Sequence, residues 1–246
     1  MFEWLRGTAY IAWKDIRVYY LKAPNLTYGL MMPVALYLAF SVTGQMNPQT
    51  LISGLVSLVI LFGTMSIEAV AVVMEKQTRT IERLMAAPLP PMALVLGKTL
   101  AGAFLGPILS IFVLVPLTLY EGASIAHPIL VLAAILVSSF TFSALGVLVS
   151  SYARWTPEAQ MYSNLLRFPM AFLAGTFMPL ESMPDSLRIV SRALPLTYSI
   201  EALREAMNIV SLTQVYLVDM IVLIIESAIL VYLSTLVLIR SFDQSN

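Results

Sequence analysis

Three consecutive residues, Gly97-Lys98-Thr99, match the end of a nucleotide-binding phosphate loop. Such a loop has the pattern G-x-x-x-x-G-K-[ST], because its glycines let backbone N–H groups close around the phosphates. Met92 stands where the first glycine is required, and the preceding Pro90-Pro91 belongs to no strand. The tripeptide therefore predicts no nucleotide site. We expect Lys98 to start an apolar helix and to extend its amine to the membrane surface.

Other residue types that support catalysis are scarce. The chain has no cysteine and one histidine, His127, which precedes Pro128 at the start of an apolar run. Thiolate chemistry and cysteine metal sites are excluded, and an intramembrane enzyme would need clustered His, Glu or Ser–His groups. We therefore expect no catalytic residue, no metal site and no cofactor on this chain.

The composition indicates a membrane protein. Of the 246 residues, 59% are hydrophobic and 11% are charged, and the mean hydropathy is +0.85. A soluble domain carries about 25% charged residues, so these charges could not cover the surface of a soluble fold. Fourteen basic and fourteen acidic residues cancel, so the net charge suggests no nucleic-acid partner.

Six stretches are long and apolar enough to cross a bilayer as helices of roughly 17–25 residues. They lie near residues 26–43, 51–74, 95–119, 129–151, 161–178 and 213–239. Backbone polar groups in lipid must be satisfied internally, and no alternating barrel pattern is present. The predicted fold class is therefore an all-α integral membrane protein, with residues 1–246 forming one transmembrane domain.

Basic residues predict the orientation. The side that we assign to the cytoplasm carries Arg6, Lys14, Arg17, Lys22, Lys76, Arg79, Arg83, Lys98, Arg154 and Arg240. The opposite links, 44–50 and 120–128, contain no Lys or Arg. The positive-inside rule therefore places both termini in the cytoplasm of a multi-pass plasma-membrane protein. The outer link 179–212 contains three arginines, which weakens this signal without reversing it.

Two segments outside the spans have helical spacing. Within residues 1–22, one face carries Leu5, Ala9, Ala12, Trp13, Ile16, Tyr19 and Tyr20, and another carries Arg6, Lys14 and Arg17. This favours an amphipathic helix in the membrane surface over a disordered basic tail. Within residues 75–88, Glu75 and Arg79 are four apart, which suits a short solvated helix. That helix could receive force from a cytoplasmic partner, although an ordinary solvated loop remains the alternative.

Several motifs together resemble the permeases of ABC type-2 exporters. They are Thr80-Ile81-Glu82, Pro88, Gly97-Lys98, Gly175-Thr176-Phe177-Met178-Pro179, Pro195-Leu196-Thr197-Tyr198 and Glu201-Ala202-Leu203-Arg204. The resemblance covers nearly the whole chain. It implies six spans, an amphipathic N-terminal helix, and two short external helices that dip back into the membrane within residues 179–212, between the last two spans.

The resemblance also implies site residues and partners. Residues 75–88 would form a coupling helix that docks on an ATPase subunit through Glu75, Arg79, Thr80, Glu82, Arg83 and Leu84. The external helices would roof the exit of the substrate path, with Pro179, Pro184, Pro195, Tyr198 and Arg204 at this gate. Two ATPase subunits, which bind ATP and Mg, would pair with two permeases, either two copies of this chain or one copy and a homologue.

One departure affects the coupling helix. The family has glycine before its Thr-x-Glu motif, and this chain has Arg79. Because arginine favours helix and glycine disfavours it, we expect Arg79 to continue the helix.

Four ionisable residues fall inside the expected spans: Glu68, Arg167, Asp219 and Glu226. Such groups are rare in membranes and face protein or water. Glu68 and Arg167 each lie roughly 9 Å from the cytoplasmic surface, at 1.5 Å per residue. They could pair, or Arg167 could extend alone to the interface. Glu226, near mid-membrane, would be protonated, hydrogen-bonded to a neighbouring helix or hydrated, and Asp219 could contact the external helices.

The leading functional prediction is the permease subunit of an ATP-driven exporter that moves an amphipathic drug, lipid or glycoconjugate by alternating access. A secondary transporter or channel driven by an ion gradient is the alternative. That class typically has inverted repeats or interrupted helices around midplane charges, and neither is apparent. Lipid and a separate ATPase are the expected partners.

Overall fold

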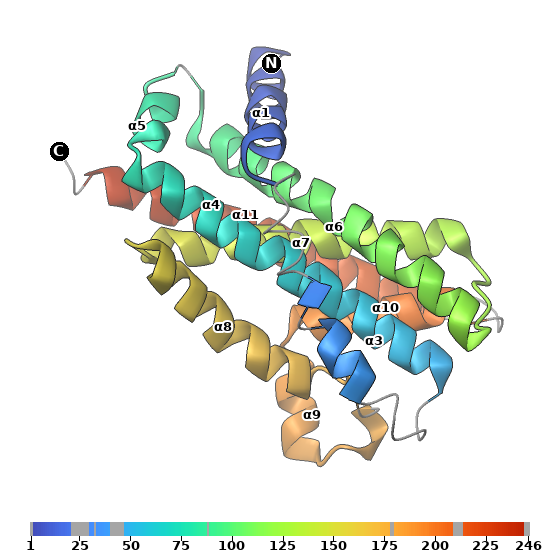
Figure 1. Cartoon of the computed structure of the whole chain (residues 1–246). Helices are drawn as coiled ribbons and strands as arrows, with labels where there is room; N and C mark the ends of the chain where they lie inside the picture. Colours follow the sequence, from blue (N-terminus) through green and yellow to red (C-terminus); the bar gives the residue numbers. More distant parts are fainter. Residues whose placement is uncertain are drawn as a thin grey trace.

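The computed structural model describes residues 2–20, 30–31, 33–39, 47–87, 89–177, 180–208 and 214–243. Within these residues the secondary structure is helical, joined by turns, and no strand occurs. The elements are α1 (Phe2–Asp15), η1 (Ile16–Tyr20), α3 (Pro48–Ile60), η2 (Leu61–Met65), α4 (Ser66–Gln77), α5 (Thr80–Met85), α6 (Pro91–Glu121), α7 (Pro128–Tyr152), α8 (Thr156–Leu173), η3 (Leu180–Ser182), α9 (Asp185–Ser191), α10 (Pro195–Met207) and α11 (Gln214–Asp243). Figure 1 shows the long helices side by side in one bundle.

Four helical stretches in the described residues are long and apolar enough to span a membrane: Pro48–Gln77, Pro91–Glu121, Pro128–Tyr152 and Gln214–Arg240. The prediction of an all-helical, multi-pass membrane protein is therefore confirmed. These four stretches correspond to the second, third, fourth and sixth expected spans.

The other two expected spans are not among these four helices. The stretch 161–178 overlaps α8, which stops at Leu173 and includes Glu158 and Arg167. Polar residues lower the hydropathy of α8 below that of the four long helices. The first expected span, 26–43, lies largely outside the described residues; its described parts, 30–31 and 33–39, are helical. The count of six spans therefore stays a prediction.

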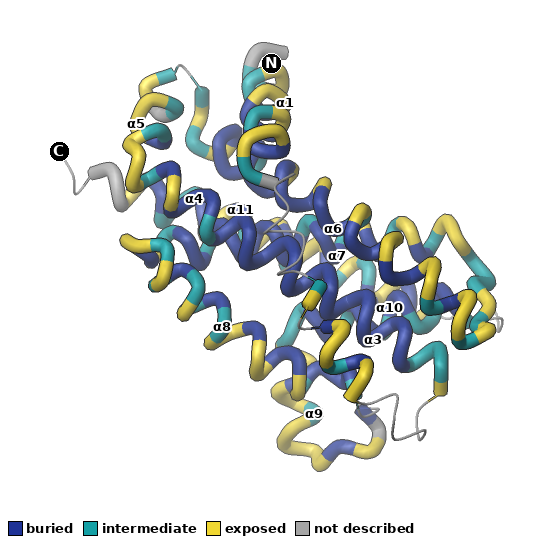
Figure 2. Tube along the Cα trace, viewed as in Figure 1, coloured by how far each residue is buried: buried dark blue, intermediate teal, exposed yellow. Residues whose placement is uncertain are grey.

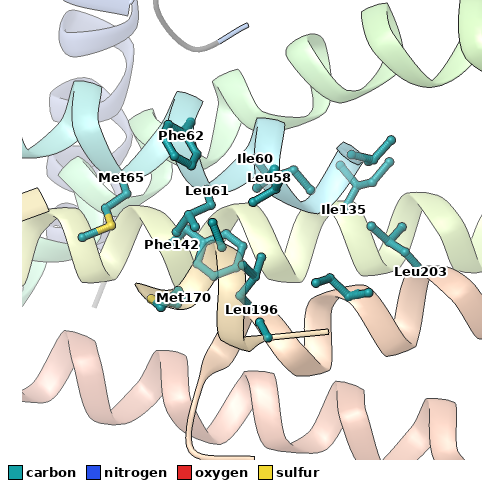
Figure 3. Packing of buried hydrophobic residues seen from close by; sticks show 14 of the residues in the cluster. Leu58, Ile60, Leu61, Phe62, Met65, Ile135, Phe142, Met170, Leu196 and Leu203 are labelled. Carbon is teal, nitrogen blue, oxygen red and sulfur yellow. The ribbon is translucent and has the colours of Figure 1, made fainter. Parts of the chain in front are cut away.

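The central helix of the bundle is the continuous run α3–η2–α4. Its most apolar window is 94% buried inside the chain, whereas that of Gln214–Arg240 is 28% buried. Figure 2 shows this difference as a dark-blue central helix with more exposed helices around it. Leu61, Phe62 and Met65 of η2 share a core cluster with Phe142 of α7 and Met170 of α8 (Figure 3).

Prolines begin several of these helices. Pro48, Pro91, Pro128 and Pro195 occupy the first turn of α3, α6, α7 and α10. Proline suits this position because its missing N–H would have no partner there in any case. At α3 the Asn47 side chain also accepts a hydrogen bond from the backbone N of Gln49, at 3.0 Å. The sequence therefore marks these starts locally.

Small residues bring the long helices together. A Cβ atom on Gly106 of α6 would lie 2.0 Å from Ser139 Oγ of α7, and one on Gly146 of α7 would lie 2.5 Å from the carbonyl oxygen of Met65. Lipid tails are as apolar as leucine, so close packing of this kind replaces the hydrophobic driving force between helices.

The segment expected outside the membrane contains η3, α9 and α10. The sequence suggests helices half sunk at the outer membrane surface, and in the structure helix α10 packs against α3, α7 and α11. Ser199 Oγ lies 3.2 Å from Ser57 Oγ of α3, and the backbone N of His127 donates to the Ala206 carbonyl at 3.2 Å. Bonds to the bundle therefore hold both halves of α10, and its depth in a bilayer stays a prediction.

Candidate functional site

The expected coupling segment is divided by a sharp turn between α4 and α5. Arg79 has φ 55° and ψ 19°, and it is the single non-glycine residue with positive φ among the described residues. The backbone N of Thr78 donates to Met74 O at 3.0 Å, and that of Arg79 donates to Lys76 O at 3.1 Å. The expectation that Arg79 continues the helix is wrong. These turn bonds hold it in the left-handed conformation that glycine adopts without strain.

Helix α5 has a buried side and an exposed side. Ile81 is 2% exposed and shares a core cluster with Ile11 of α1 and Val95 of α6, against which Leu84 also packs. Glu82 and Arg83 are exposed, as is Arg79 in the turn before them, and Thr80 is half-buried. Residues 79–84 therefore present charges from a short helix whose Ile81 packs in one core cluster with residues of α1 and α6. No spacing in the sequence marks Ile81 for this packing role.

Charged residues of α1, α4 and α6 form a network of ion pairs. We call it the buried charge network, and its members are Lys14, Asp15, Glu75 and Lys98. Lys14 Nζ donates to Glu75 Oε1, and Lys98 Nζ donates to Glu75 Oε2. Asp15 accepts from Lys98 at 3.2 Å and lies 2.9 Å from Lys14 Nζ. The side chains of Glu75, Lys98 and Asp15 are 0%, 1% and 3% exposed. Two positive and two negative charges thus compensate each other where α1, α4 and α6 meet.

This network bears on two expectations. The Glu75 side chain is 0% exposed and accepts from both lysines, so its expected contact with an ATPase stays a prediction. Lys98 does not extend to the membrane surface, because Glu75 and Asp15 hold its amine inside the protein. Burial raises the pKa of Asp15, an effect that the nearby Lys98 opposes. Burial alone would lower the pKa of Lys14, but hydrogen bonds to Glu75 and Asp15 raise it above its usual value.

The tripeptide that resembles a phosphate loop has packing roles. A Cβ atom on Gly97 would lie 2.9 Å from Ile11 Cβ and from the Thr8 carbonyl oxygen, so glycine permits the close approach of α1 to α6. The Thr99 carbonyl accepts a hydrogen bond from Ser143 Oγ of α7 at 2.8 Å. With Lys98 in the charge network, Gly97-Lys98-Thr99 joins α6 to α1, α4 and α7.

Helix α1 has two different faces. Thr8, Ile11, Ala12, Asp15 and the following Ile16 are buried. Leu5, Tyr10 and Trp13 are 50%, 75% and 63% exposed. Part of the apolar face expected to meet lipid, Ala12 and Ile16, thus packs on protein instead.

The two ionisable residues at similar expected depths are both fully buried. Arg167 donates to Asn164 Oδ1, and its Cζ lies 4.5 Å from the centre of the Phe62 ring. It therefore does not extend to the interface as a snorkelling arginine would. A Cβ atom on Gly102 would lie 2.7 Å from Glu68 Oε2, so this glycine makes room for the carboxylate. A pair between Glu68 and Arg167 stays a prediction.

The acidic residues of α11 face different surroundings. Asp219 is 1% exposed and Glu226 is half-buried. Burial, followed by the charge of Glu226, raises the pKa of Tyr198 on α10. Helix α11, which carries Glu226, packs against α10.

The expected external gate is held together by bonds around α10. Tyr198 donates its hydroxyl to the Arg192 carbonyl at 2.5 Å, and Arg204 Nη2 donates to the Gly175 carbonyl at 3.4 Å. Arg192 and Glu201 form an ion pair at 2.6 Å. Pro184 and Pro195 precede and begin α9 and α10, whereas Pro179 lies outside the described residues. The role of these residues as a gate stays a prediction.

The bundle of long apolar helices defines the chain as a multi-pass membrane protein. Sequence comparison makes the assignment specific, because the profile of the family described as "ABC-2 type transporter" matches residues 8–208. The chain belongs to this family of transport membrane proteins.

Curated relatives match over a shorter region. The chain is 36% identical over 73 residues to Nodulation protein J of Sinorhizobium fredii (strain NBRC 101917 / NGR234). It is 32% identical over 73 residues to Nodulation protein J of Rhizobium meliloti (strain 1021). Each alignment covers 30% of this chain and 28% of the relative. The alignments thus span about a quarter of the length of these relatives.

Proposed function

We propose that this chain is the membrane-spanning subunit of an ATP-driven exporter, and that its ATPase is a separate cytoplasmic chain. The ABC-2 family assignment supports a transport subunit. Nucleotide and Mg²⁺ would bind to the ATPase, since Gly97-Lys98-Thr99 lacks the remainder of a phosphate loop. The cargo would be amphipathic and would move outward by alternating access between two permeases.

The observation that carries this proposal is the attachment of α5. Glu82 and Arg83 are exposed, while Ile81 and the buried charge network fasten the neighbouring chain to α1, α4 and α6. A displacement of such a helix would move the long helices directly, because flexible linkers would absorb little of it. We propose Arg79, Glu82 and Arg83 as the direct contacts with the ATPase, and Glu75 as a residue that positions them.

Charge reversal at Glu82 tests this role. In membranes that contain the cognate ATPase subunit, Glu82→Lys should reduce co-purification of that subunit by about tenfold, as loss of an interfacial charge contact of 1–2 kcal/mol would require. Transport should fall in parallel, while the amount of inserted permease should not change. Asp185→Lys, at an exposed position on α9, is the matched control. Normal assembly and transport by the Glu82→Lys variant would assign coupling to another surface.

A further inference from the structure

A second site lies at the same end of the bundle, where α4 and α11 end and where α7 gives way to α8. It is a cavity of about 630 Å³, lined among the described residues by Lys76, Arg154 and Arg240 together with Tyr152 and Trp155. We call it the cationic pocket. Its three cations come from three different parts of the chain, and no acidic residue is among its described lining residues.

Among the described residues, one carboxylate lies close to these cations: Glu158 Oε2 accepts a hydrogen bond from the backbone N of Arg154 at 2.8 Å. Within the described part of the chain, neither the Arg154 nor the Arg240 guanidinium forms an ion pair. Lys76 Nζ donates to the carbonyl oxygens of Ser150 and Ser151, at 2.6 and 3.3 Å, which fixes its amine against the end of α7. The pocket therefore has a positive charge whose position the fold determines.

An apolar groove continues from the cationic pocket. Its cavity of about 390 Å³ lies between α7 and α8, and its lining runs on α7 from Leu145 to Tyr152, with Leu165 and Leu166 on α8. Tyr152 lines both cavities. The seven helical steps from Leu145 to Tyr152 extend about 10 Å along the axis. Figure 1 shows that α8 leaves the end of α7 and diverges from it.

We propose that the cationic pocket and the apolar groove together bind one acidic phospholipid of the adjacent leaflet. The phosphate group lies against Arg154 and Arg240, and an acyl chain lies in the groove below Tyr152. Basic pockets between membrane helices attract anionic headgroups, and aromatic residues favour the level of the headgroups. The cations thus favour an anionic headgroup, and the apolar walls of the groove favour the acyl chain of the lipid.

An acidic surface of a protein partner fits these features less well. Such a surface could neutralise the arginines, but it would leave about 10 Å of apolar groove between α7 and α8 without an occupant. A free phosphate ion would leave the same groove unoccupied. A lipid satisfies both parts of the site, and this inference does not depend on the proposed exporter function.

The three tryptophans of the chain permit a direct test, since Trp155 lines the pocket. In the full chain with Trp4→Phe and Trp13→Phe, Trp155 fluorescence is measured in nanodiscs of phosphatidylcholine that contain brominated lipid. Brominated phosphatidylglycerol should quench Trp155 more strongly than brominated phosphatidylcholine. Arg154→Gln and Arg240→Gln should each lower the preference for the acidic lipid about fivefold, the effect expected for one cation near an anionic headgroup. Arg240→Lys should retain most of it.

The control variant is Arg17→Gln, which removes an exposed cation of η1 outside the pocket and should leave the preference unchanged. Equal quenching by the two lipids in the unmodified pocket would overturn the proposal. So would full displacement of phosphatidylglycerol by millimolar inorganic phosphate, which would indicate a site for a simple anion. If the Arg154→Gln/Arg240→Gln variant kept the lipid preference but lost an ATPase subunit on purification, the pocket would instead be a protein interface.

Discussion

Lys98 Nζ, on α6, lies 3.2 Å from Asp15 Oδ2 at the end of α1, although the two residues are 83 positions apart in the chain. Lys98 also donates to Glu75 at the end of α4. One amine therefore connects the N-terminal helix, the central helix and the helix that follows α5. The orientation of α5 depends on this connection, because α5 is joined directly to α4 and α6.

Removal of one member of the buried charge network should be more harmful than removal of an opposite pair. Lys98→Met leaves a buried carboxylate without compensation, which should cost about 3–5 kcal/mol of stability. The double variant Lys98→Met/Glu75→Gln leaves Lys14 with Asp15 and should lose less than Lys98→Met alone. Thermal unfolding in detergent measures both effects.

A surface pair provides the control for this comparison. Arg188 and Asp185 form an ion pair on exposed α9, and Arg188→Met should change the unfolding temperature little, because exposed pairs contribute little. Additive losses in the Lys98→Met/Glu75→Gln variant would show that the two side chains do not depend on each other.

The turn at Arg79 should accept glycine. A left-handed conformation costs a non-glycine residue about 1–2 kcal/mol, and greater freedom of glycine in the unfolded chain offsets about 0.4–1 kcal/mol of any gain. Arg79→Gly should therefore raise stability slightly, by up to about 1 kcal/mol. Arg79→Val should lower it, because β-branched residues tolerate positive φ poorly. Unfolding curves of the two variants should differ in opposite directions from the parent, and destabilisation by glycine would contradict the observed turn.

Alkaline pH should loosen α1 from the bundle. The pKa of Lys14 is raised above 10.5 in the folded protein, because its hydrogen bonds to Glu75 and Asp15 outweigh the effect of burial. The stabilisation is therefore fully present below pH 10.5, the unfolded pKa, and is lost as the pH rises through the higher folded value. Protease cleavage within residues 2–15 would detect the release of α1. Lys14→Arg should move the loss to higher pH, since arginine stays protonated there, and an unchanged midpoint would assign the release to another group.

The two ends of the bundle should be accessible from opposite sides of the membrane. The natural chain has no cysteine, so single cysteines can be introduced at Asp185, Arg192 and Arg83, all exposed. A membrane-impermeant thiol reagent applied from outside should label the first two positions and not the third. The reason is that basic residues concentrate at the end that carries Arg83. Labelling of Arg83→Cys from outside in sealed cells would reverse the predicted topology.

Local sequence patterns predicted where helices begin better than they predicted which residues the helices would bury. Pro48, Pro91, Pro128 and Pro195 mark helix starts that depend on one residue's own backbone. The packing of α10 against other helices could not be predicted in the same way. Its mixture of apolar and charged residues suits a surface helix, but contacts with α3, α7 and α11 bury eight of its residues: Leu196, Thr197, Ser199, Ile200, Ala202, Leu203, Ala206 and Met207.

The proposed coupling segment shows the same division. The exposed charges Glu82 and Arg83 could be identified from spacing and family resemblance. The burial of Glu75 could not, because its partners Lys14 and Lys98 are distant in sequence. One signal in the sequence does point to it: Lys98 is a charge inside an apolar stretch, and a lysine that stays buried there requires a carboxylate partner.

The sequence by itself determined that this chain is a helical membrane protein of the ABC-2 type, because hydropathy, helix starts and family motifs depend on residue types and short spacings. Only the tertiary structure decided which charges face a partner and which are enclosed. A charged side chain is stable inside a protein only when an opposite charge is brought within a few ångströms. Asp15, Glu75 and Lys98 acquire that proximity only when Gly97 lets α1 pack against α6.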